Sequence, residues 1–117
     1  MTDQLVRPAL RAILDAIEGI DNATRGKTLE DFGSDWLLRH GVQRGVEIVS
    51  EAARRIPPEV QGRQPQIPWP QIMGIGNVLR HEYHQVSDTL IWNVVQVNLP
   101  PLKTAVLAIE AELTEES

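Results

Sequence analysis

The stretch DWLLRHGVQRGVEIVSEAARRI, residues 35–56, decides the fold class of this chain. Its apolar residues recur every three or four positions, which is the repeat of one face of an α-helix. They are Trp36, Leu37, Leu38, Val42, Val46, Val49, Ala52, Ala53 and Ile56. Ser34 or Asp35 provides an N-cap, and Pro57-Pro58 stops the helix. We therefore predict one long amphipathic helix with a broad apolar stripe.

Two glycines, Gly41 and Gly45, lie four residues apart inside this predicted helix. A glycine in a helix interior costs about 1 kcal/mol relative to alanine. Close packing against a neighbouring helix would compensate for that cost. A helix that simply tolerates both glycines explains the pattern equally well, so both interpretations stay open.

The rest of the chain also has helical spacing and no clear strand. Before the long helix, we predict a first helix over residues 5–20 and a short helical turn that is capped by Thr28 and broken at Gly33. After it, we predict a polar loop over 57–67, a third helix over 68–83 and a fourth helix over 89–98 that is capped by Ser87 or Asp88. A fifth helix begins after a break at Pro100-Pro101 and runs to about residue 112. We predict a single domain over residues 1–117, an all-α, up-and-down bundle of four to five helices with an acidic tail from about residue 110.

Composition narrows the function classes. The chain of 117 residues has no cysteine, which excludes disulfides and thiolate metal sites. No apolar run approaches the roughly 20 residues that span a bilayer, and the N-terminus lacks an apolar signal core, so we expect a cytoplasmic protein with no membrane partner.

Four of the 16 acidic residues lie in the last eight positions, which leaves twelve acidic against 11 basic residues elsewhere. Because no basic surplus exists, RNA contact requires a local cluster or a cleft made by two chains.

Polar side chains gather at the end of the third predicted helix. They are Asn77, Arg80, His81, Tyr83 and His84. RNA cleavage by transesterification needs a base for the ribose 2′-hydroxyl, an acid for the leaving oxygen and a donor for the phosphate charge. Imidazole transfers protons near neutrality, and arginine is a suitable donor. Spacing alone favours a plainer interpretation, in which His81 and His84 are solvated or capping residues beside the core.

One alternative ion site was considered on the long helix. Glu47 and Glu51 lie one turn apart and could bind a cation. No histidine stands near them, so we interpret them as a solvated face or as ion-pair partners of Arg44 and Arg55. We predict no metal site and no cofactor.

The order of motifs resembles the HepT-like branch of the HEPN proteins, which are small helical toxins that cleave RNA without metal. The residues that carry the resemblance are Pro68-Trp69, Ile72-Met73-Gly74, Asn77, His81-Glu82-Tyr83, the run from Trp92 to Leu102 with its Asn98-Leu99-Pro100, and the run from Val46 to Ile56 on the long helix. The likeness covers about residues 8–110.

The resemblance implies a homodimeric RNA endonuclease with its cleft between two subunits. His81 would be the acid and base, Arg80 the phosphate donor and Asn77 an orienting group, with His84 as a secondary candidate. The partner would be a minimal nucleotidyltransferase antitoxin, which in some systems transfers AMP to the tyrosine, here Tyr83.

One departure from the family pattern stands at Gly76, where the family's arginine is expected. Either Arg80, four residues later, takes its role, or this chain is a weakened or inactive subunit that binds, or is modified on Tyr83 by, a nucleotidyltransferase. A helical dimer of unrelated purpose is the third reading.

Overall fold

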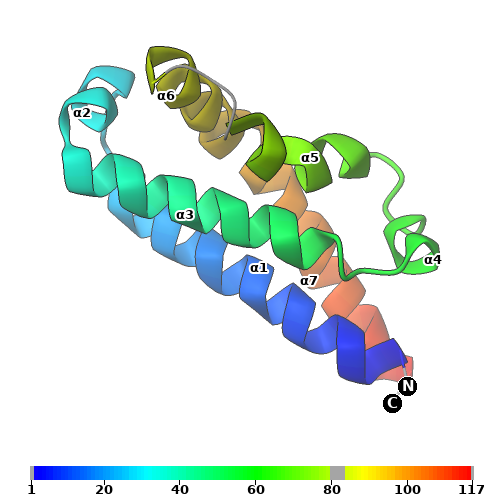
Figure 1. Ribbon diagram of the computed structural model, residues 1–117. Coiled ribbons are helices and arrows are strands. Elements are labelled where there is room, and N and C mark those ends of the chain that lie inside the picture. Colours follow the sequence, from blue (N-terminus) through cyan, green and yellow to red (C-terminus); the bar gives the residue numbers. More distant parts are fainter. Residues whose placement is uncertain (1, 80–83, 117) are drawn as a thin grey trace.

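The computed structural model describes residues 2–79 and 84–116, and within these ranges the chain is helical and has no strand (Figure 1). The elements are α1 (Thr2–Thr24), α2 (Leu29–Ser34), α3 (Trp36–Ala53), α4 (Pro58–Gln61), α5 (Trp69–Leu79), α6 (His84–Asn93), the π-helical turn η1 (Val94–Asn98) and α7 (Leu99–Glu116). The predicted all-α bundle is confirmed.

The long helices α1 and α3 run antiparallel, and α7 packs along α1 (Figure 1). The start of α1 and the end of α7 lie side by side, and an ion pair of 2.9 Å joins Arg11 Nη2 to Glu110 Oε2. The predicted acidic tail thus begins inside α7. Helices α5 and α6 lie away from the end of the bundle where the two termini meet, and α3 contacts both of them.

The core is formed mainly by the apolar stripes of α1, α3 and α7. The stripe of the first predicted helix is buried: Leu10, Ile13, Leu14, Ile17 and Ile20. In the long helix, Val42, Val46 and Val49 are buried as the pattern indicates. Trp36 and Leu37, however, are 66% and 73% exposed. The helical period alone does not locate the end of the buried stripe, because α1 and α6 cover only part of α3.

Local signals in the sequence mark several helix ends correctly. Thr28 and Asp31 form a capping box at the start of α2, and the Asp35 side chain accepts a hydrogen bond of 3.0 Å from Leu38 N–H at the start of α3. The hydrogen bond from the Thr28 backbone N–H lowers the pKa of the Asp31 carboxyl. Gly26, with φ of 75°, follows α1 in the left-handed region that glycine adopts at little cost.

The two glycines of the long helix differ in their surroundings. A Cβ atom added to Gly45 would lie 2.8 Å from Ile20 Cδ1, whereas a Cβ atom on Gly41 would meet nothing within 4 Å. Close packing of α3 on α1 therefore accounts for Gly45. The helix merely tolerates Gly41.

Several predicted boundaries are wrong. Gly33 lies within α2, and a helical turn, α4, lies in the predicted polar loop. The fourth helix begins at His84 rather than after a cap at Ser87 or Asp88. The predicted break at Pro100-Pro101 is replaced by the π-helical turn η1, since both prolines fit in the first turn of α7. Within the described ranges, no helix has the length and apolar character that crossing a membrane requires.

Candidate active site

Helix α5, which leads into the predicted catalytic residues, is held on α3 by polar contacts. Ser50, 2% exposed on α3, donates a hydrogen bond of 2.8 Å to the Met73 carbonyl of α5. Arg54 Nε donates to the same carbonyl at 2.9 Å, and the Gly76 N–H donates to Ser50 Oγ at 3.5 Å. These three contacts fix the position of α5 along α3 and thereby place its last turn.

Gly76 is not required by the packing between α5 and α3. A Cβ atom added there would lie 3.7 Å from Ser50 Oγ, which is ordinary van der Waals contact. A Cβ atom at this position is therefore compatible with the observed packing of α5 on α3. The absence of the family's arginine at residue 76 has no steric cause in the described structure.

Asn77 lies in the last turn of α5 and is exposed. Among the described residues, its side-chain amide has no hydrogen-bond partner. Arg80, His81 and Tyr83 fall in residues 80–83, outside the described residues, and so does the side chain of His84. Their predicted roles stay predictions.

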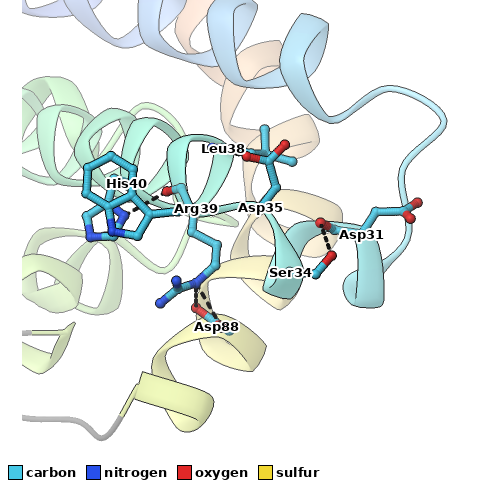
Figure 2. Close-up of polar contacts among 8 residues, drawn as sticks. Asp31, Ser34, Asp35, Leu38, Arg39, His40 and Asp88 are labelled. Atoms are coloured by element: carbon cyan, nitrogen blue, oxygen red, sulfur yellow. Dashed lines mark hydrogen bonds and ion pairs between the residues drawn. The ribbon is translucent and has the colours of Figure 1, made fainter.

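The segment that carries these residues connects two helices that α3 holds in place. On the α5 side, Leu79 is 4% exposed and belongs to the core. On the α6 side, Arg39 Nε of α3 lies 3.1 Å from both carboxylate oxygens of Asp88, and the two side chains are 12% and 13% exposed (Figure 2). A nearly buried ion pair depends strongly on both partners, so Arg39 and Asp88 fix the start of α6.

A ring contact supports the C-terminal end of α6. Phe32 of α2 is fully buried, and its ring centroid lies 5.4 Å from that of Trp92 of α6. The sequence pattern offered Ser87 or Asp88 as a helix cap and did not reveal the pairing of Asp88 with Arg39. The two residues are 49 positions apart, and neither residue type is distinctive, so no local signal in the sequence reveals the pair.

Other charged residues of the long helix have ordinary structural roles. Arg44 Nη1 lies 3.6 Å from Glu47 and 3.3 Å from Glu51, which confirms their interpretation as ion-pair partners of Arg44. His40 is exposed: its Nδ1 lies 2.7 Å from the Trp36 carbonyl oxygen (Figure 2), and its ring lies over the Trp36 indole. Among the described residues, no three His, Asp or Glu side chains gather as a metal site would require.

These features define the class of protein: an all-α bundle of the HEPN type, in which a helix ending in a polar motif leads into the next helix beside a long central one. The family model described as Ribonuclease HepT-like matches residues 13–109, and the chain belongs to this family of ribonucleases. The resemblance inferred from the motifs is thereby confirmed.

Individual relatives agree with this assignment. The chain is 33% identical over 103 residues to "Putative RNase TTE0752" of Caldanaerobacter subterraneus subsp. tengcongensis, which covers 88% of this chain and 92% of the relative. It is 35% identical over 94 residues to "Probable ribonuclease HepT" of Thermococcus cleftensis, covering 80% and 86%.

A longer relative matches as well. "Gamma-glutamylcyclotransferase and putative RNase MJ0434" of Methanocaldococcus jannaschii is 35% identical over 108 residues, which are 92% of this chain and 49% of that protein. The chain therefore spans about half the length of this relative. No solved structure matches the chain significantly.

Proposed function

We propose that this protein is a metal-independent RNA endonuclease, the toxin of a toxin–antitoxin pair, that acts as a homodimer in the cytoplasm. The observation that carries the proposal is the family match over residues 13–109 together with the order Asn77, Arg80, His81, Tyr83 in the sequence. The exposed Asn77 amide supports it, because a substrate can reach the last described turn before this segment.

The proposed reaction is transesterification. His81 takes the proton of a ribose 2′-hydroxyl, whose oxygen attacks the neighbouring phosphorus. The bond between phosphorus and the 5′-oxygen breaks, and a protonated imidazole, supplied by His81 of the second copy, returns a proton to that oxygen. The guanidinium of Arg80 stabilises the charge that develops on the phosphate oxygens, and Asn77 orients the substrate. The products are a 2′,3′-cyclic phosphate and a 5′-hydroxyl.

The test is expression of the chain alone, followed by an RNA cleavage assay with excess EDTA. Wild type is expected to arrest growth and to cut single-stranded RNA, leaving 3′ ends that a ligase joins to a 5′-phosphorylated adapter only after the cyclic phosphate is removed. His81→Ala is the matched inactive control. Wild type that is non-toxic and inert on several RNAs overturns the endonuclease proposal.

The glycine at residue 76 supports a second candidate, a weakened subunit that serves a minimal nucleotidyltransferase. In that case the Tyr83 hydroxyl oxygen attacks the α-phosphorus of ATP, a new oxygen–phosphorus bond forms, pyrophosphate leaves and the phenolic proton passes to a base. The added phosphate charge beside His81 would repel RNA. Mass spectrometry after co-expression with such a transferase tests this candidate, and a tyrosine that stays unmodified removes it.

A further inference from the structure

A cavity of about 500 Å³ lies between α5 and the junction of α6 with the turn η1. This volume falls within the range of roughly 300–1,000 Å³ that is usual for small-molecule sites. Five side chains make an apolar wall: Ile72, Ile75, Val78, Leu90 and Val94. Gly74 also lines the cavity, and a Cβ atom added there would meet nothing within 4 Å.

Three amide side chains line the same cavity: Gln71, Asn93 and Asn98. Among the described residues, none of these amides has a hydrogen-bond partner. Each offers one acceptor and two donor hydrogens. We name this cavity, with its apolar wall and three amides, the amide pocket.

The π-helical turn brings two of these amides together. The Leu99 N–H donates to the Val94 carbonyl, a bond across five residues that widens the helix. In a regular α-helix, residues five apart would point about 140° away from each other around the axis. In the wider turn, Asn93 and Asn98 line one cavity. Single π-helical turns occur often at functional sites, and this one shapes the amide pocket.

The composition of the pocket selects one kind of ligand. None of the described residues that line it is charged, so these residues offer no counter-charge to a phosphate or a cation. A plain hydrocarbon makes no use of the three amides, which are exposed or half-exposed. A flat, neutral group with donors and acceptors on its edge satisfies both the apolar wall and the amides, and an unpaired nucleobase is such a group.

The pocket also reaches the last described turn of α5. Val78 lines it and directly follows Asn77, and Gly74 lies one helical turn before Asn77. A base held in the pocket would leave its phosphate near the end of α5, where Arg80 and His81 follow in the chain.

We propose that the amide pocket binds an unpaired base of the RNA substrate next to the phosphodiester that is cut. The inference rests on the proposed ribonuclease function for the identity of the ligand. It adds that the enzyme selects single-stranded RNA and prefers certain bases at one position, because amide donors and acceptors match base edges differently.

The experiment uses the full chain with His81→Ala, so that RNA is bound and not cut. The probes are single-stranded tetranucleotides of adenylate, cytidylate, guanylate or uridylate, and an abasic tetranucleotide of equal charge. Binding is measured by fluorescence anisotropy, and the side-chain amide resonances of Asn93 and Asn98 are followed by NMR. We expect at least one tetranucleotide to bind about 10-fold more tightly than the abasic one and to shift both amide resonances.

Three variants test the pocket itself. Asn98→Leu keeps the side-chain size and removes the amide, and Gly74→Leu fills the cavity from a position with free space and better helix propensity. Each is expected to reduce the preference over the abasic probe about 10-fold. Gln96→Leu is the matched control, because Gln96 is exposed on the same turn and does not line the cavity.

The outcomes separate this inference from the proposed function. If wild type cuts RNA and Asn98→Leu and Gly74→Leu cut it with unchanged KM and base preference, the pocket is refuted while the ribonuclease stands. If no RNA is cut, yet nucleotides shift the Asn93 and Asn98 resonances, the pocket stands and the enzyme proposal fails. If the variants only convert a dimer to a monomer in light scattering, the cavity holds a second copy of this chain, and the inference is overturned.

Discussion

Exchanging the arginine between residues 80 and 76 tests whether Arg80 supplies the phosphate donor. The exchange uses four chains: wild type, Arg80→Ala, Gly76→Arg, and the double variant with both changes. The exchange is feasible because a Cβ atom at residue 76 lies 3.7 Å from Ser50 Oγ, which is ordinary van der Waals contact and leaves the packing of α5 on α3 unchanged. Replacing a helix-interior glycine also adds about 1 kcal/mol of helix propensity.

The expected magnitudes follow from the role of the donor. Removing one preorganised donor from a developing oxyanion reduces kcat by about 10²–10³-fold. Arg80→Ala is therefore expected to lose that much activity, and the double variant to regain most of it. Gly76→Arg alone is expected to change kcat less than about 10-fold, because wild type already has its donor.

The assay is the initial rate of cleavage of a single-stranded RNA that carries a fluorophore and a quencher. Gly76→Ala, alone and with Arg80→Ala, is the matched control that adds a Cβ atom and helix propensity without a donor. All variants are first checked for folding by thermal unfolding, where the changes at residue 76 are expected to raise Tm by about 4 °C.

A specific pattern would refute this reasoning. If Gly76→Arg alone raises the rate 100-fold or more while Arg80→Ala has no effect, then wild type has no donor at all. Arg80 is then a bystander, and the chain is the weakened subunit of the second candidate function.

Three further predictions concern the scaffold. Gly41→Ala is expected to raise the free energy of unfolding by about 1 kcal/mol through helix propensity. Gly45→Ala is expected to lower it by about 1 kcal/mol, because its Cβ atom displaces Ile20 at an overpacking cost of about 2 kcal/mol, which exceeds the gain in propensity. Equal urea midpoints for the two variants would contradict the packing argument. Arg39→Met is expected to cost about 3 kcal/mol in urea unfolding, since the nearly buried Asp88 carboxylate loses its ion pair with Arg39. Asp88→Leu added to it is expected to recover most of that loss, and additive costs would disprove the coupling. The hydrogen bond from the Thr28 N–H lowers the pKa of the Asp31 carboxyl in the folded state, so the carboxylate stabilises the fold above its unfolded pKa of about 3.9 and loses that contribution as pH falls through the lower folded pKa. The difference in unfolding free energy between wild type and Asp31→Asn should therefore shrink in acid. A difference that stays constant would exclude this linkage.

Sequence patterns predicted those parts of the fold that depend on neighbours in the chain. The caps at Thr28 and Asp35 were found because a cap and its target lie within three residues. The end of the third helix and the catalytic residues that follow Asn77 were proposed from motif order, and residues 80–83 lie outside the described structure. The break expected at Pro100-Pro101 was wrong, because the prolines tolerate a first helical turn and the π-helical turn before them keeps the chain helical.

The sequence by itself determined the helical class, the family and the order of the motif residues, because periodicity and motifs act over a few positions. Only the tertiary structure decided which glycine packs against α1, that Arg39 anchors α6 through Asp88, and that Gln71, Asn93 and Asn98 line one cavity. These relations join residues that are distant in the chain or separated by an irregular turn. They follow from how the helices are placed against one another, which no local repeat specifies.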